Sequence, residues 1–120
     1  MANIVEEVEN LYDQYEKELI HLSDRIWEHP ETRFKETESV KVFTTYLRQI
    51  GFEIEMGVGG IDTAFVAKYG TEGPVIGILG EYDALPGLSQ KAGSPIREPL
   101  VEGGNGHGCG HNLLGTAGIG

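Results

Sequence analysis

The sequence predicts a domain of the α/β class, and three observations support this prediction. Two stretches with helical periodicity open the chain, at residues 3–28 and 35–50. Short segments with strand character follow at residues 52–56, 63–69 and 75–79. A chain of 120 residues, 39% of them hydrophobic and 23% charged, is also large and apolar enough to bury a core. We therefore expect two N-terminal helices followed by a mixed sheet.

The two helices are predicted from apolar residues that recur three and four positions apart. In residues 3–28 the apolar positions that share one face are Val8, Leu11, Tyr15, Leu19, Leu22 and Ile26. Pro30 is expected to end this helix near His29, because proline disfavours helical backbone in the residue before it. In the second helix the expected buried positions are Val40, Phe43, Leu47 and Ile50. Gly51 is suited to end that helix in the left-handed conformation.

The strand segments lead to a candidate functional region. Residues 52–56 alternate apolar and acidic side chains, which is typical of a strand with one face in water. Residues 75–79 are apolar throughout apart from one glycine, which is typical of a strand buried on both faces. Glu81 and Asp83 follow directly, at the point where α/β sheets bind their ligands. Residues 87–106 show no regular period and predict a long loop, which is expected to be functional or disordered.

Composition excludes several classes of function. The formal net charge of −10 argues against nucleic acid and against anionic membrane surfaces, because both attract basic proteins. A single cysteine cannot form an internal disulfide, so nothing indicates an oxidising compartment. The acidic N-terminus lacks the apolar stretch of a signal peptide. We therefore expect a cytoplasmic protein with no nucleic-acid or membrane partner.

The run from Asn105 to Asn112 places His107, Cys109 and His111 in alternation with glycine. Imidazole nitrogen and thiolate sulfur are preferred ligands of zinc. Cys109 and His111 reach one ion if the segment is extended, because residues two apart then point to the same side. If a helix begins earlier, His107 and His111 share a face instead. Zinc takes four ligands, so further ligands must come from elsewhere.

Other interpretations of these residues stay open. Cys109 could be a nucleophile activated by His107 or His111, or the run could be a glycine-rich turn with a buried thiol. Glu81 and Asp83 could bind a metal, orient a ligand histidine or tune a general base. They could equally form a solvated turn in which Asp83 caps the following loop.

Three segments, residues 26–34, 80–90 and 104–115, resemble the aminoacylase / glutamate-carboxypeptidase family of metallohydrolases, and within it the amidohydrolase branch. The resemblance covers the whole chain. It implies a zinc-peptidase-like, three-layer α/β/α catalytic domain with a mixed sheet. On this resemblance, residues 1–120 are the N-terminal part of that catalytic domain, and the dimerisation domain and C-terminal catalytic segments of the family are absent from the sequence.

The resemblance also implies a chemistry. Members of the family hold two divalent metals, zinc or manganese, and cleave an amide with metal-bound water. Cys109 and His111 match metal ligands of the amidohydrolase branch, and Asp83 matches the aspartate that supports catalysis. Other branches have a histidine ligand where this chain has Glu81, and His107 is implied to shape the loop. The implied substrate is an N-acyl amino acid or a p-aminobenzoyl-glutamate-like amide.

Three functional hypotheses follow. The first is a part of a metal-dependent amidohydrolase or peptidase that is inactive alone, because the family supplies its general-base glutamate and its remaining ligands from later segments. The second is a non-catalytic chain that binds a metal or a partner subunit. The third is a cysteine-dependent enzyme. A sheet that lacks its usual cover further predicts homo-oligomers, or association with a related partner subunit.

Overall fold

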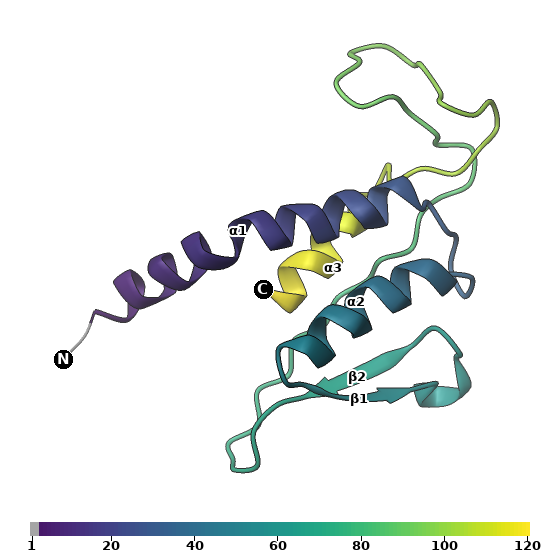
Figure 1. Cartoon of the computed structure of the whole chain (residues 1–120). Helices are drawn as coiled ribbons and strands as arrows, with labels where there is room; N and C mark the ends of the chain where they lie inside the picture. The colour runs from purple at the N-terminus through teal and green to yellow at the C-terminus, as the bar shows by residue number, and fades with distance from the viewer. Residues whose placement is uncertain (1–2) are drawn as a thin grey trace.

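The computed structural model describes residues 3–120. Its elements in chain order are α1 (Ile4–Glu28), α2 (Thr37–Gln49), β1 (Glu53–Met56), the short 3-10 helix η1 (Val58–Gly60), β2 (Phe65–Lys68) and α3 (His111–Ile119). α3 packs along α1, and α2 lies between α1 and the β1–β2 hairpin (Figure 1). Helices and strands are both present, as the α/β prediction requires, whereas the three-layer arrangement stays a prediction.

α1 begins and ends close to the predicted positions. The side chain of Asn3 accepts a hydrogen bond from the Val5 N–H at 3.1 Å and caps the start of the helix. At the other end, His29 Nδ1 lies 2.8 Å from the Arg25 carbonyl oxygen, immediately before Pro30. The helix therefore stops where proline makes the helical conformation unfavourable.

The predicted apolar face of α1 is buried only in its C-terminal half. Leu22 and Ile26 belong to the core, whereas Val8, Leu11 and Tyr15 are exposed. The N-terminal half of α1 extends beyond the other described elements, which therefore leave its apolar side chains uncovered (Figure 1). Its periodicity identified the helix correctly, but periodicity does not show where a packing partner ends.

α2 supplies most of the core. Val40, Phe43 and Leu47 are buried as predicted, but Ile50 is 39% exposed and the prediction for it was wrong. Ile50 is the C-cap of α2, so its side chain leaves the buried stripe. The central cluster consists of Leu22, Ile26, Val42 and Phe43, with Leu19, Tyr46, Phe65, Tyr82 and Ile119 packed against it.

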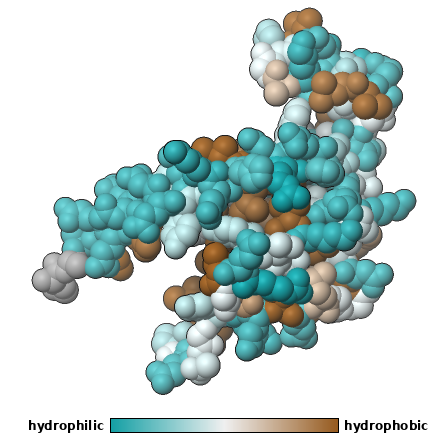
Figure 2. Space-filling view, viewed as in Figure 1, coloured by the Kyte–Doolittle hydropathy of each residue, from teal (hydrophilic) through white to brown (hydrophobic). Residues whose placement is uncertain are grey.

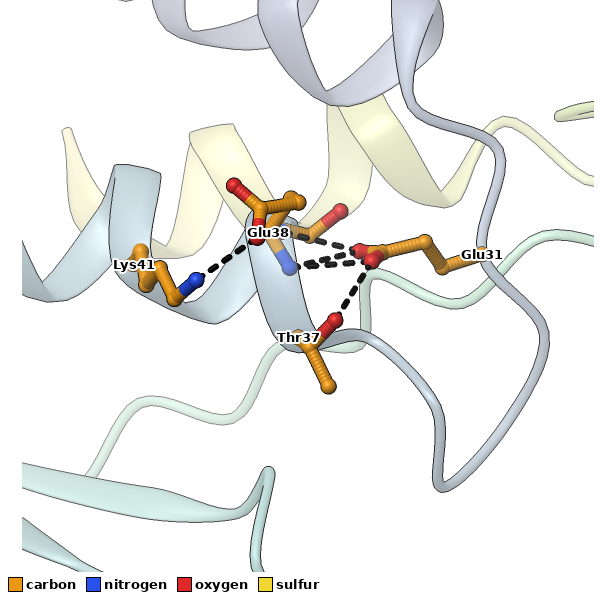
Figure 3. Close-up of polar contacts among 5 residues, drawn as sticks. Glu31, Thr37, Glu38 and Lys41 are labelled. Carbon is orange, nitrogen blue, oxygen red and sulfur yellow. Dashed lines mark hydrogen bonds and ion pairs between the residues drawn. The ribbon is translucent and has the colours of Figure 1, made fainter.

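Glu31 caps the start of α2 from outside the helix (Figure 3). Its carboxylate accepts hydrogen bonds from the backbone N–H groups of Glu38 and Ser39, each at 2.9 Å, and from the Thr37 hydroxyl at 3.1 Å. Burial raises the pKa of Glu31, but these hydrogen bonds outweigh it and leave the pKa below its ordinary value. The first-turn N–H groups of α2 are thus satisfied by a carboxylate.

The only sheet in residues 3–120 is the antiparallel pair of β1 and β2. Glu53 lies opposite Lys68 and Met56 lies opposite Phe65. The predicted mixed sheet is therefore not formed by these residues, because its third strand has no partner among them.

That third strand, residues 75–79, is the largest difference from prediction. The segment forms no strand and no backbone hydrogen bond within the described chain. The side chains of Val75, Ile76, Ile78 and Leu79 are 74–96% exposed. Its sequence has the composition of a buried strand, but no neighbouring strand in residues 3–120 offers it N–H and C=O groups.

The long loop at residues 87–106 contains no helix or strand, as predicted. It projects from the body at the upper right of Figure 1, and the space-filling view shows apolar patches on it (Figure 2). Its most exposed large apolar side chains are Ile96, Leu100 and Val101. Within residues 3–120, no helix has the length and apolar character that crossing a membrane requires.

Candidate metal centre

Three predicted site residues come together at the start of α3. Glu81, Asp83 and His111 each offer one ligand atom, and these atoms lie within 4.8 Å of one another. Glu81 and Asp83 follow the extended segment 75–79, and His111 is the first residue of α3. The group forms because α3 returns along α1 and brings its N-terminus to the two carboxylates.

The two ring nitrogens of His111 face different carboxylates. Nδ1 lies 2.7 Å from Asp83 Oδ1, and Nε2 lies 3.6 Å from Glu81 Oε2. A carboxylate accepts hydrogen bonds, so Nδ1 donates its hydrogen to Asp83 and the lone pair of the neutral ring is on Nε2. The side chains of Asp83 and His111 are 22% and 17% exposed, whereas that of Glu81 is 66% exposed.

This arrangement fits a divalent metal. Nitrogen and oxygen ligands about 2.0–2.2 Å from a tetrahedral zinc ion lie roughly 3.4 Å apart. The 3.6 Å between His111 Nε2 and Glu81 Oε2 is close to that separation and too long for a hydrogen bond. A carboxylate that holds the other nitrogen of a ligand histidine, as Asp83 does, is the usual support in metal sites.

Backbone bonds on both sides fix the segment that carries the two carboxylates. The Ala84 N–H donates to the Glu31 carbonyl at 2.7 Å, next to a parallel bridge between Thr32 and Ala84. Leu85 exchanges two hydrogen bonds of 3.0 Å with Gly106. The chain after Asp83 is therefore held between the α1–α2 connection and the glycine-rich loop.

α3 approaches closely because one of its residues has no side chain. A Cβ atom at Gly115 would lie 2.9 Å from the Glu81 carbonyl oxygen and 3.0 Å from the Phe43 ring. Asn112 adds a buried anchor, because its amide donates to the Ser23 hydroxyl at 3.0 Å. Both contacts hold His111 next to the carboxylates.

His107 lies outside the group and contacts α1 instead. Its Nε2 donates to the Ile26 carbonyl at 3.0 Å, and its Nδ1 is buried without a partner among the described residues. Burial lowers the pKa of His107, the hydrogen bond to Ile26 opposes this, and nearby His111 lowers the pKa further. Asn105 similarly donates to the Pro30 carbonyl at 3.0 Å. These contacts are those expected of a loop-shaping residue, and the role itself stays a prediction.

Cys109 is a free, exposed thiol and is not a member of the three-residue group. The expectation that Cys109 and His111 point to one side assumed an extended segment. Gly110 instead adopts the left-handed conformation, with φ of 73°, and α3 begins at His111. Metal binding by Cys109 stays a prediction. Glu81 lies beside His111, where it could bind a metal as one of the sequence hypotheses expects, and that role stays a prediction.

Comparisons with known proteins match this chain to hydrolases. It is 53% identical over 96 residues to a subunit of the p-aminobenzoyl-glutamate hydrolase of Escherichia coli, covering 80% of this chain. It is 31% identical over 122 aligned positions to "Thermostable carboxypeptidase 2" of Saccharolobus solfataricus, covering 96% of the chain. It is 33% identical over 106 positions to "N-acetylcysteine deacetylase" of Bacillus subtilis, covering 82% of the chain. No protein-family model matches.

The matches cover only part of these relatives. The aligned region spans 20% of the E. coli protein, 30% of the S. solfataricus protein and 27% of the B. subtilis protein. The similarity nevertheless extends over at least 80% of this chain in each of the three comparisons. Over most of its length, the chain is a member of the family of amidohydrolases and carboxypeptidases that its motifs resemble.

Proposed function

We propose that this chain forms part of the catalytic domain of a metal-dependent amidohydrolase. The observation that carries the proposal is the group of Glu81, Asp83 and His111, whose ligand atoms lie within 4.8 Å of one another. The hydrolase relatives support amide hydrolysis as the class of reaction. The donors are oxygen and nitrogen atoms, which suit zinc and manganese alike.

The three side chains have different roles in this proposal. His111 Nε2 and the Glu81 carboxylate would hold the metal, and Asp83 keeps the proton of His111 on Nδ1. Cys109, an exposed thiol two residues before His111, is proposed as a further ligand. A divalent metal held there would supply Lewis-acid chemistry, which lowers the pKa of water toward neutrality and polarises an amide carbonyl.

The proposed substrate is an N-acyl amino acid or a p-aminobenzoyl-glutamate-like amide. Support comes from relatives that are named for the hydrolysis of p-aminobenzoyl-glutamate and the deacetylation of N-acetylcysteine. We propose that residues 1–120 do not turn over such a substrate alone, since they span 20–30% of these relatives. Because the E. coli relative is named as one subunit of its enzyme, we also propose a partner subunit or a second copy. The proposed location is the cytoplasm, on the composition of the sequence alone.

The test is zinc and manganese binding by the purified chain, measured by calorimetry and by metal content. His111→Ala and Glu81→Gln should each lower occupancy strongly, and Cys109→Ser measures the contribution of the thiol. Glu55→Gln is the matched control, because Glu55 is an exposed carboxylate paired with Lys68 at 3.2 Å in the hairpin. Undiminished occupancy in His111→Ala would overturn the proposed site.

We also propose a second function, metal binding without catalysis, because the chain contains all three group members but spans only 20–30% of its relatives. It predicts metal binding of the same strength with no hydrolysis when the remainder of a relative's domain is supplied. Hydrolysis in the presence of the remaining domain would instead support the amidohydrolase proposal.

A further inference from the structure

Tyr82 lies between Glu81 and Asp83 in the sequence, but its side chain points away from the candidate metal centre and toward the core. Successive side chains of an extended segment point to opposite faces. Glu81 and Asp83 accordingly lie beside His111, whereas Tyr82 packs against the core cluster. Its ring meets Phe43 edge-on, with centroids 5.3 Å apart and an interplanar angle of 85°.

The hydroxyl of Tyr82 belongs to a network of hydrogen bonds on the core side of residues 81–83. It donates to the Thr63 carbonyl. The Thr63 hydroxyl donates to Glu36 Oε2 at 2.6 Å, and Glu36 Oε1 accepts the Phe34 N–H at 3.0 Å. Thr63 and Glu36 are 6% and 8% exposed, so the centre of this network is buried, where a hydrogen bond holds its geometry firmly.

We infer that Tyr82 is a positioning residue of the candidate metal centre: the anchorage of its hydroxyl to Thr63 fixes how the 81–83 backbone is rotated, and so keeps Glu81 and Asp83 turned toward His111. This inference rests on the proposed metal site. Rotation of the backbone about the long axis of this extended segment moves all three side chains together. A residue fixed on the core side therefore sets the direction of both carboxylates on the other side.

A purely packing role for Tyr82 makes a different prediction. The ring alone fills the space beside Phe43, so phenylalanine would serve equally well if packing were all that mattered. Only the positioning role requires the hydroxyl. Tyr82→Phe removes that group and keeps the ring, which makes it the informative variant. Tyr69→Phe is the matched control, because Tyr69 also packs on an aromatic ring, that of Phe52 at 5.1 Å, in the hairpin region.

Two measurements on the 120-residue chain test the inference. The first is the imidazole NMR spectrum of His111 without metal, in which the Nδ1 proton hydrogen-bonded to Asp83 gives a characteristic signal. The second is zinc affinity by calorimetry. We expect Tyr82→Phe to shift or broaden the Nδ1 proton signal and to weaken zinc binding about tenfold, as loss of a ligand's supporting contacts does. Tyr69→Phe should change neither.

The outcomes separate the inference from the proposed function. If Tyr82→Phe folds and both readouts match wild type, the positioning role is wrong. If the wild type binds no zinc, the proposed function fails, and the His111 signal alone decides the role of Tyr82. If Tyr82→Phe does not fold, 4-fluorophenylalanine at position 82 takes its place. Its fluorine fills the volume of the hydroxyl but cannot donate to the Thr63 carbonyl, so an unchanged His111 signal in that variant overturns the inference.

Discussion

The hydrogen bond between Asp83 and His111 determines which ring nitrogen is available to a ligand. Their atoms are 2.7 Å apart, and both side chains are mostly shielded from water. In such a setting, a carboxylate holds the ring in one orientation, with the other nitrogen free to bind a ligand. The role of Asp83 therefore depends on its charge as well as its shape.

Asp83→Asn tests the importance of that charge. The amide retains an oxygen that can accept from Nδ1, so the ring should keep its orientation while losing the negative neighbour. We expect zinc affinity to fall by about 10- to 100-fold, measured by calorimetry. An affinity equal to wild type would show that Asp83 does not act through His111. Asp62→Asn, in the turn before β2, is the control for loss of one aspartate charge.

His107 should make the fold sensitive to mild acid. Its pKa is lowered chiefly by burial, so the folded state keeps it neutral at a pH where the unfolded chain has taken up a proton. The stability it contributes is complete above the unfolded value of 6.5 and is lost as the pH falls below it. His107→Gln, which retains a donor for Ile26, should therefore lose less stability than wild type on acidification.

The measurement is the urea midpoint of unfolding at about pH 7.5 and about pH 5.5. His21→Gln is the control, because His21 is exposed on α1. Equal acid sensitivity in wild type and His107→Gln would contradict the prediction.

The candidate site could be predicted from sequence only in part. Asp83 and His111 were found from their motifs, because ligand-type side chains near a strand end and in a glycine-rich run are local signals. Their pairing depends on α3 docking against α1, and no local signal contains that contact. For Cys109 the local argument was insufficient. It assumed an extended segment, in which Cys109 and His111 point to the same side, and did not anticipate the left-handed turn at Gly110.

At the scale of elements, both N-terminal helices were predicted within one or two residues at each end. Their signals are local: apolar periodicity, a proline after α1 and a glycine after α2. The segment 75–79 was not predicted correctly, because a strand exists only when a second strand pairs with it. Its composition suits a buried strand, but a strand forms only if another part of the molecule pairs with it.

The cap on α2 gives a prediction for a whole element. Glu31→Gln removes a charge that accepts two backbone N–H bonds in the first turn. We expect the free energy of unfolding to fall by about 1 kcal/mol, as for loss of an N-cap. Because the hydrogen bonds lower the pKa of Glu31, this stabilisation is present above the ordinary value of 4.5 and is lost as the pH falls below it.

Urea unfolding at neutral pH and at about pH 3.5 measures this difference. Glu55→Gln is the control, because an exposed ion pair in the hairpin contributes little. A Glu31→Gln variant as stable as wild type at neutral pH would show that water replaces the carboxylate without loss.

At the scale of the whole molecule, residues 75–79 are an exposed segment whose backbone groups are unpaired within the described residues. Unpaired N–H and C=O groups beside exposed Ile and Val side chains are a template for pairing with another chain. We therefore expect the chain to self-associate as its concentration rises, measured by light scattering after size-exclusion chromatography. Ile78→Lys should reduce this association, because a charge on an edge strand opposes pairing.

Ile96→Lys separates strand pairing from general apolar attraction. Ile96 is 69% exposed, close to the 74% of Ile78, but it lies on the irregular loop at residues 87–106. If both variants reduce association equally, apolar exposure is the cause. A wild-type chain that stays monomeric at high concentration would contradict the prediction itself.

The close approach at Gly115 has a consequence for the ring of His111. A methyl group there would meet the Glu81 carbonyl oxygen and the Phe43 ring at 2.9–3.0 Å, so the helix would have to back away. His111 would move with the helix, and its hydrogen bond to Asp83 would lengthen. The distance between His111 and the two carboxylates thus depends on Gly115, a residue that contributes no functional group and matters because it has no side chain.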